Sequence, residues 1–312
     1  MRIEYHRTLI ADGVRNAALH AALKAVIKPG VTTVADIGAG TGLLGMMAAS
    51  LGAKAVYLYE SAAVGEVAAR IVKANKVRGC QVIPCHSCEM IEPPRVDVVV
   101  SETLGNYAFE ENIIDTLNDA RARFLIPGGV IIPGRVTQFV APVTGDRIQG
   151  ELTVWDRVGY GLDMGIARTM SLNNAYVRQL EPGELLDGGK SAKAWDEVDF
   201  SRPEKANRKG DARWEVSKPA TVQGFAVWWS AELAPGIALS TGPGAPRTHW
   251  EQLYFPLLAP IEAAAGETVS VSLRSRSSEA GGTHLAWTAV HLDAKGGHVS
   301  RQALDLDKGF LP

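Results

Sequence analysis

The chain has 312 residues, which is too long for one ordinary hydrophobic core and suits two domains. Apolar residues make up 46% and charged residues 21%, as is typical of soluble globular proteins. The net charge of −2 and the isoelectric point near 6.4 argue against nucleic-acid binding as the main task, because phosphate contacts need a clustered basic surface. No signal-peptide-like apolar run begins the chain, and no segment approaches the ~20 apolar residues of a membrane span. We therefore expect a cytoplasmic protein that acts on neither nucleic acid nor membranes.

The first 133 residues alternate apolar strands with helical stretches, which predicts a parallel sheet covered by helices. Strands are expected at 33–37, 55–59, 81–83, 96–100 and 130–132, and helices at 42–51, 62–75 and 111–124. The Pro-Gly-Gly sequence at 127–129 predicts a turn before the last of these strands. This pattern is typical of a Rossmann-like, doubly wound α/β domain over residues 1–133.

Three cysteines, Cys80, Cys85 and Cys88, lie close together in the sequence, with His86 between the last two. A Cys-x2-Cys pair beside a histidine is one arrangement of metal ligands. A structural zinc site closes with four ligands, however, and no second ligand pair lies nearby. We therefore predict no metal site and interpret the cysteines as small residues around the end of a strand.

Residues 134–312 have a different character. Short runs rich in β-branched and aromatic residues, separated by Gly and Pro, occur at 222–229, 252–258 and 268–273. They predict an antiparallel β-barrel or sandwich rather than further βαβ units, and we assign a β-barrel substrate domain. The charged segment 187–213 is open to two interpretations, a substrate-recruiting surface or solvated loops, and loops of such composition are commoner.

A glycine-rich stretch, Asp36-Ile37-Gly38-Ala39-Gly40-Thr41-Gly42, follows the first predicted strand and opens a helix. Glycines there allow a tight turn and a close approach of the backbone to a ligand. The Gly-x-Gly-x-Gly spacing departs from the Gly-x-Gly-x-x-Gly fingerprint of dinucleotide sites. Glu60 ends the second predicted strand, where an acidic side chain can bind both ribose hydroxyls. The combination favours S-adenosylmethionine over a dinucleotide, because this nucleoside has no pyrophosphate to bind.

Two carboxylates, Glu102 and Glu111, lie at the ends of a loop that follows the predicted strand 96–100. Such a pair suits a planar cation, since a guanidinium stays protonated and carries five N–H donors in a fixed fork. The triplet Thr248-His249-Trp250 brings an imidazole and an aromatic ring from the second half of the chain.

Together these motifs resemble those of the protein arginine methyltransferases, over nearly the whole chain. Residues 34–44 are similar to the first cofactor motif of that family, and Tyr59-Glu60-Ser61 to its ribose-binding acid. Residues 101–111 are similar to its double-glutamate loop, and 239–243 with 248–250 to its substrate-side loop.

The resemblance extends to the beginning of the chain and implies roles for individual residues. Residues 6–15 are similar to the family's His-Glu-x-Met-Leu-x-Asp-x-x-Arg segment. The match implies that Arg15 binds the cofactor's carboxylate, that Asp12 pairs with His249, and that His6 lines the cofactor pocket. Without the resemblance, Asp12 and Arg15 would be an ordinary ion pair on a helix surface. Glu89 is the implied acceptor for the adenine amino group, across a short gap in the alignment.

The sequence also departs from the family's pattern. Only five residues precede His6, where the family has a helix carrying tyrosines, so we expect a compact member with a shortened N-terminus. Thr103 and Asn106 replace the loop's usual Trp and Tyr, which affects substrate size and product type. Glu110 offers another candidate for the second carboxylate, but the family spacing favours Glu111 and leaves Glu110 on the surface.

The resemblance implies methyl transfer from S-adenosylmethionine to a guanidino nitrogen of arginine in a protein or peptide. Glu102 and Glu111 would orient the guanidinium. His249 with Asp12 would be either an outlet for the proton or only a scaffold, and the sequence leaves both roles open. A free arginine or another guanidino metabolite is an alternative acceptor. A nicotinamide-dependent oxidoreductase, from a different class, would leave the two carboxylates unexplained, and an inactive binding module is disfavoured because they are intact.

An assembly is implied as well. Residues 155–164 resemble the segment that leads into the arm through which these enzymes dimerise. We therefore expect a homodimer, formed through an arm near residues 153–180 that lies on the cofactor domain of the partner.

Overall fold

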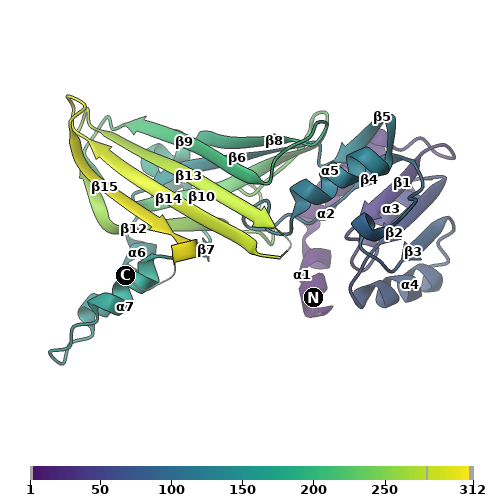
Figure 1. Ribbon diagram of the computed structural model, residues 1–312, viewed down its shortest axis with the longest axis horizontal. Coiled ribbons are helices and arrows are strands. Elements are labelled where there is room, and N and C mark those ends of the chain that lie inside the picture. Colours follow the sequence, from purple (N-terminus) through teal and green to yellow (C-terminus); the bar gives the residue numbers. More distant parts are fainter. Residues whose placement is uncertain (1–2, 279, 309–312) are drawn as a thin grey trace.

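In the computed structural model, which describes residues 3–278 and 280–308, a parallel α/β unit is followed by two antiparallel sheets (Figure 1). The parallel sheet has the order β3-β2-β1-β4-β5, and every neighbouring pair is parallel. Its strands are β1 (Thr33–Ile37), β2 (Ala55–Tyr59), β3 (Cys80–Ile83), β4 (Val96–Val100) and β5 (Leu125–Ile132). The helices of this unit are α1 (Ile3–Ala11), α2 (Gly13–Val26), α3 (Leu43–Ser50), α4 (Val64–Ala74) and α5 (Ile113–Arg123). The Rossmann-like, doubly wound fold expected from the sequence is confirmed.

The strand order determines where a ligand can bind. The chain passes from β1 outward through β2 and β3, then returns to β4 on the other side of β1. The carboxyl ends of β1 and β4 therefore flank the point at which the strand order reverses, where open α/β sheets bind their ligands. The glycine-rich stretch follows β1, and the two predicted carboxylates lie beyond β4.

The last strand of this sheet differs from the prediction. A turn was expected at residues 127–129, but β5 runs through them as one strand from Leu125 to Ile132. The pairing with β4 shifts register between Val96 and Val98, and Gly128 has a φ of 78°. β5 is the edge strand of the sheet and tolerates this irregularity. Pro127 has no N–H donor, and on the open side of an edge strand no neighbouring strand needs one.

Apart from the helical arm, the described residues from Arg135 onward form the predicted antiparallel barrel, which is confirmed. One sheet has the order β7-β12-β10-β6-β8 with β11 paired to β10, and the other has the order β15-β14-β13-β9. The strands are β6 (Arg135–Val143), β7 (Tyr176–Arg178), β8 (Lys193–Asp199), β9 (Asn207–Glu215), β10 (Ala220–Ala234), β11 (Ile237–Ser240), β12 (Gln252–Ala263), β13 (Thr268–Ser278), β14 (Gly282–Leu292) and β15 (His298–Asp305). Phe255 and Trp287 stack between the two sheets at 4.8 Å and fill the interior.

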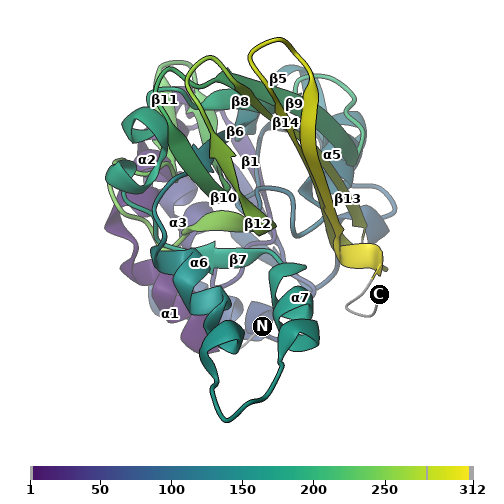
Figure 2. The same ribbon diagram turned by 90° about the vertical axis from the view of Figure 1, so that its left-hand side faces the viewer.

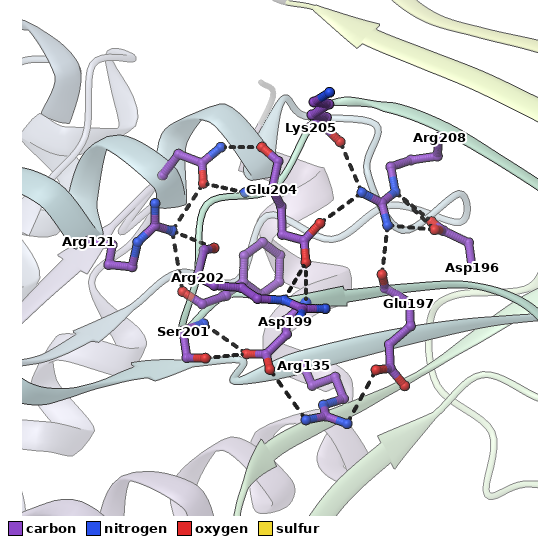
Figure 3. A network of polar contacts seen from close by, with 12 residues as sticks. Arg121, Arg135, Asp196, Glu197, Asp199, Ser201, Arg202, Glu204, Lys205 and Arg208 are labelled. Atoms are coloured by element: carbon purple, nitrogen blue, oxygen red, sulfur yellow. Dashed lines mark hydrogen bonds and ion pairs between the residues drawn. The ribbon is translucent and has the colours of Figure 1, made fainter.

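The charged segment 187–213 does not form loops alone, and this part of the prediction is wrong. It contains β8 and most of β9, and its charges pair with one another (Figure 3). The Arg208 guanidinium contacts Asp196 at 2.7 Å and Glu204 at 3.0 Å. Arg121 on α5 donates to the carbonyl oxygen of Arg202 at 2.8 Å, so the network joins the barrel to the α/β unit. Composition alone could not reveal that neighbouring strands would neutralise these charges.

A helical arm extends from the barrel between β6 and β7 (Figures 1 and 2). It consists of α6 (Arg147–Leu152), the short helix η2 (Val154–Arg157) and α7 (Gly165–Leu172). Its tip carries Tyr160, Leu162 and Ile166, which are 95%, 61% and 73% exposed. Apolar side chains this exposed on an extended element are typical of a contact surface.

Among the described residues, no helix is both long and apolar enough to cross a membrane.

Candidate active site

The glycine loop, residues 38–42, approaches two other segments so closely that side chains are excluded. Gly38 and Gly40 have φ angles of 71° and 56°, a region that residues with a side chain rarely adopt. A Cβ on Gly38 would lie 2.7 Å from Cγ2 of Thr103, and one on Gly40 would lie 3.0 Å from Cε1 of His6. The loop therefore packs directly beneath α1 and the segment after β4.

A cavity of about 260 Å³ opens above this loop, at the carboxyl ends of β1 and β4. All but one of the predicted cofactor residues line it: His6, Arg15, Asp36, Gly38, Gly40 and Glu60. Both predicted substrate carboxylates, Glu102 and Glu111, line it as well. Residues separated by up to about a hundred positions in the sequence thus share one small cavity.

The carboxylates of Glu60 and Asp36, which both line this cavity, accept hydrogen bonds from backbone N–H groups. The Glu60 carboxylate accepts hydrogen bonds from the N–H groups of Gly40 and Ala62, each at 2.8 Å. Each of its oxygens keeps a lone pair with which it can accept a ligand hydroxyl. Asp36 accepts from the Gly45 N–H at 2.8 Å, and burial raises the pKa of this carboxyl to about 7.

His6 supplies a polar atom that has no partner. Its side chain lines the cavity, its exposed fraction is 6%, and its Nε2 makes no hydrogen bond to any described residue. Burial lowers the pKa of His6, and the nearby Glu60 carboxylate opposes that effect only in part. A buried polar atom without a partner is costly, so the position suits a ligand that brings a hydrogen-bonding group. The nucleoside cofactor expected from the sequence meets this need.

Arg15 and Glu102 form an ion pair inside the cavity, which the sequence did not predict. The Nε and Nη2 groups of Arg15 both donate to one oxygen of Glu102, and the side chains are 6% and 4% exposed. The other oxygen of Glu102 accepts from the Leu104 N–H at 3.3 Å. Burial raises the pKa of Glu102 to about 7, and the Arg15 charge is the largest influence in the opposite direction. Arg15 thus orients a carboxylate besides lining the predicted cofactor site.

Glu111 has very different surroundings. It is solvent-exposed overall, and its carboxylate makes no hydrogen bond or ion pair to the described part of the chain. Partial burial, with the neighbouring Glu110 charge, raises the pKa of Glu111. Its oxygens are therefore free to accept hydrogen bonds from a cation that enters the cavity.

Glu110 faces away from that cavity and is occupied locally. Its carboxylate accepts a hydrogen bond from the Tyr107 N–H at 3.0 Å and folds back against Gly105. Glu110 therefore caps its own loop, and this geometry supports Glu111 as the second carboxylate.

Asp12 and His249 lie together behind Arg15. One oxygen of Asp12 accepts from the backbone N–H of His249 and contacts the ring Nδ1, both at 2.8 Å. The other caps α2 by accepting from the Arg15 N–H at 2.9 Å. Although burial opposes the change, the hydrogen bonds from Arg15 and His249 lower the pKa of Asp12. Burial lowers the pKa of His249, and the hydrogen bond and charge of Asp12 oppose this effect. Neither residue is among those that line the cavity.

The predicted adenine acceptor, Glu89, is the cofactor residue that the structure does not bring to the cavity. It is exposed at the end of η1 (Ser87–Glu89), whereas Cys85, His86 and Ser87 line the cavity beside it. The three cysteines are free thiols, and the described residues include no cluster of metal-ligating side chains.

Tyr5 is a cavity residue that sequence reasoning missed. It lies on α1, one position before His6, and lines the cavity. Burial is the main cause that raises the pKa of Tyr5, followed by the charges of Glu111 and Glu102, which line the same cavity. The signals in the sequence were an aromatic residue next to His6 and its place, where the family has a helix carrying tyrosines.

The fold and the site define an α/β protein with a nucleoside-type pocket and a pair of acceptor carboxylates, joined to a β-barrel. Two family models match the chain: "Arginine methyltransferase oligomerization subdomain" over residues 135–288 and "Ribosomal protein L11 methyltransferase (PrmA)" over residues 18–137. Among curated proteins, protein arginine N-methyltransferase 6 of Xenopus tropicalis is 30% identical over 295 residues, which span 91% of this chain and 86% of that protein. Protein arginine N-methyltransferase 1 of Chlamydomonas reinhardtii is 30% identical over 281 residues, or 87% of this chain and 80% of that protein.

The chain therefore belongs to the protein arginine N-methyltransferase family. Solved structures share its fold. A PRMT1 enzyme–prozyme heterotetrameric complex with AdoHcy from Trypanosoma brucei has a TM-score of 0.86 at 22% identity, covering 97% of this chain and 98% of that one. Protein arginine methyltransferase 10 of Arabidopsis thaliana has a TM-score of 0.82 at 23% identity, covering 98% of each chain.

Proposed function

We propose that this protein transfers a methyl group from S-adenosylmethionine to a guanidino nitrogen of arginine in a protein substrate. One observation carries the proposal: Glu102 and Glu111 line the same cavity as the glycine loop and Glu60, in a chain of this family. The cofactor side and the cation side of the reaction are therefore adjacent.

The residues that would hold the cofactor fit its chemistry. The ribose hydroxyls suit the free lone pairs of Glu60, and the backbone of the glycine loop allows the close approach that the nucleoside needs. Arg15 has the planar donors that bind a carboxylate. Its Nε and Nη2 donate to Glu102 and its Nη1 to Asn16, which leaves one N–H on each terminal nitrogen for a ligand. The cofactor supplies an electrophilic methyl group on a sulfonium, and two relatives are solved with its demethylated product, AdoHcy or SAH.

The chain's own contribution is to bring two cations together in a small cavity. Glu102 and Glu111 accept N–H bonds from the guanidinium, which orients it and offsets its repulsion from the sulfonium. Alignment of the attacking nitrogen with the methyl group is worth up to about 7–11 kcal/mol. The attacking nitrogen loses a proton, and Glu111 is the carboxylate placed to release it, because it faces solvent while Glu102 is buried.

The Asp12–His249 pair acts as a scaffold in this proposal. Both side chains are almost fully buried, and the pair fixes the first turn of α2, from which Arg15 reaches Glu102. His249 thus supports the site through Asp12 and Arg15 and does not itself accept the substrate proton.

We further propose that the protein is a homodimer and works in the cytoplasm. The apolar tip of the arm and the match to an oligomerization subdomain support the dimer. The proposed location rests on a composition typical of soluble globular proteins.

Tritium transfer from methyl-labelled S-adenosylmethionine tests the function directly. We expect incorporation into a Gly-Arg-rich peptide, and none when lysine replaces each arginine of that peptide. Free arginine is measured in parallel. Labelling of free arginine with an unlabelled peptide would replace the protein substrate by a metabolite, and labelling of neither would contradict the proposal.

A further inference from the structure

Two buried tryptophans of the barrel hold the carboxylate loop, residues 101–111, by its backbone. The indole Nε1 of Trp229 donates to the carbonyl oxygen of Gly105, and that of Trp250 donates to the carbonyl oxygen of Leu104, each at 2.9 Å. The two tryptophans are 0% and 3% exposed. Consecutive carbonyls of a loop in the α/β unit are therefore bound by side chains of the other domain.

The indole pair is itself rigid. The rings of Trp229 and Trp250 pack edge to face, with centroids 4.9 Å apart and an angle of 72° between their planes. Trp229 lies within β10 opposite Gln138 of β6, and on its other side its backbone N–H donates to the Thr241 hydroxyl at 3.2 Å. Two donors fixed in this way place the loop carbonyls with little freedom.

The two carboxylates depend on this arrangement unequally. Glu102 is fixed from the α/β unit, because Arg15 and the Leu104 N–H bind its oxygens. Glu111 has no such side-chain partner among the described residues, so the backbone that precedes it sets its position. The loop receives two more bonds from the barrel. The Glu251 N–H donates to the Asn106 side-chain oxygen at 2.9 Å, and the Thr283 hydroxyl donates to the Glu110 backbone carbonyl at 3.3 Å.

We propose that Trp229 is a positioning residue for methyl transfer: with Trp250, it sets the separation of Glu102 and Glu111 by binding the loop between them. The inference rests on the proposed function for its catalytic consequence. The barrel thereby determines the geometry of the guanidinium site although the cavity itself is lined by residues of the α/β unit. A misplacement of about 1 Å can reduce a rate by about 10²-fold, so loss of one loop bond is expected to lower kcat about tenfold or more.

Trp229→Phe tests this, because phenylalanine keeps an aromatic ring and removes only the donor and part of the indole. Trp287→Phe is a matched control: its indole donates to the Pro256 carbonyl at 2.9 Å, it is 1% exposed, and its ring packs on Phe255 at 4.8 Å. The control removes the same kind of bond within the barrel, and Trp287 neither donates to the loop nor lines the cavity. The measurements are melting temperature, kcat and KM on the peptide, affinity for S-adenosylhomocysteine, and deuterium exchange of amides 103–111.

Both variants are expected to melt at a similarly lowered temperature and to bind S-adenosylhomocysteine as the native protein does. Only Trp229→Phe should lose kcat and exchange the loop amides faster. Trp250→Phe should act in the same way and takes its place if Trp229→Phe does not fold. Equal kcat and equal loop exchange in the two variants would overturn the inference. A native protein without methyl transfer would instead contradict the proposed function, and loop exchange would still decide whether Trp229 positions the loop.

Discussion

Glu102 and Glu111 serve one cavity from opposite environments. Glu102 is buried and bound by Arg15, whereas Glu111 is exposed and makes no bond to the described residues. Glu110, next to it, caps the Tyr107 N–H instead. Three glutamates within ten positions of the chain thus have three different roles, and substitution of each one should affect methyl transfer differently.

Glu102→Gln and Glu111→Gln should each lower the methyl-transfer rate at least tenfold. An amide keeps the size of the side chain but loses the charge, and a charge-assisted hydrogen bond contributes about 1.5–3 kcal/mol. Glu110→Gln should be nearly silent, since the amide oxygen can still accept from Tyr107. The assay is peptide methylation with cofactor affinity measured separately. Near-normal rates for both Glu102→Gln and Glu111→Gln would contradict the paired-carboxylate site.

The pH profile of kcat/KM should fall on the acid side with an inflection near 7. This parameter reports the free enzyme, in which burial raises the pKa of Glu102 to about 7. The reactive form is the carboxylate, so the rate is highest above that pKa and falls as Glu102 becomes protonated. The residual rate of Glu102→Gln should lack the inflection. An unchanged inflection in that variant would assign it to another group.

At the scale of elements, the arm exposes apolar side chains that no other described part of the monomer covers. Its tip residues Tyr160, Leu162 and Ile166 are among the most exposed apolar side chains described, although α6 at its base is anchored to the barrel. An element with a buried base and an apolar tip is suited to reach a second molecule.

The double substitution Leu162→Glu and Ile166→Glu should convert the proposed dimer to a monomer at micromolar concentration. Two charges at the tip would have to be desolvated in the interface, without partners. Val299→Glu is the control, since Val299 is 53% exposed but lies on β15 of the barrel, outside both the arm and the cofactor domain. Mass by light scattering is the measurement. A dimeric double variant would place the interface elsewhere, and a monomeric native protein would contradict the homodimer.

At the scale of the whole molecule, α1, the parallel sheet and the barrel all contribute to one site. His6 comes from α1, Glu60 follows β2, and Trp250 donates to the carboxylate loop from the barrel. Ligand binding at such a junction should stabilise the molecule as a unit.

S-adenosylhomocysteine at about a hundred times its Kd should therefore raise the melting temperature by roughly 5–10 °C. The linkage energy at that concentration is about 2.7 kcal/mol, and each kcal/mol shifts the melting temperature by about 2–4 °C in a protein near this size. NAD at the same concentration should give no shift. The reverse result would favour the oxidoreductase alternative.

Glu89→Gln should keep the shift in melting temperature with S-adenosylhomocysteine, because Glu89 does not line the cavity. Loss of that shift in the variant would restore Glu89 as the adenine acceptor.

The sequence by itself determined the features that local pattern can specify. The run 96–100 forms β4, because a strand buried on both faces of the sheet requires apolar side chains. The glycines after β1 form the tight loop, because its positive φ angles favour glycine. The spacing of Glu102 and Glu111 and the Thr-His-Trp triplet were enough to predict the family, which sequence comparison confirmed.

Only the tertiary structure decided which distant groups meet. It paired Arg15 with Glu102, turned Glu110 away from the cavity, left Glu89 outside it and placed the Trp229 indole on the Gly105 carbonyl. It also folded the charged segment 187–213 into β8, which pairs with β6, and most of β9, which pairs with β13. These outcomes depend on contacts between residues as many as 124 positions apart, and no local periodicity records them, because the partner of a buried polar group is chosen by packing.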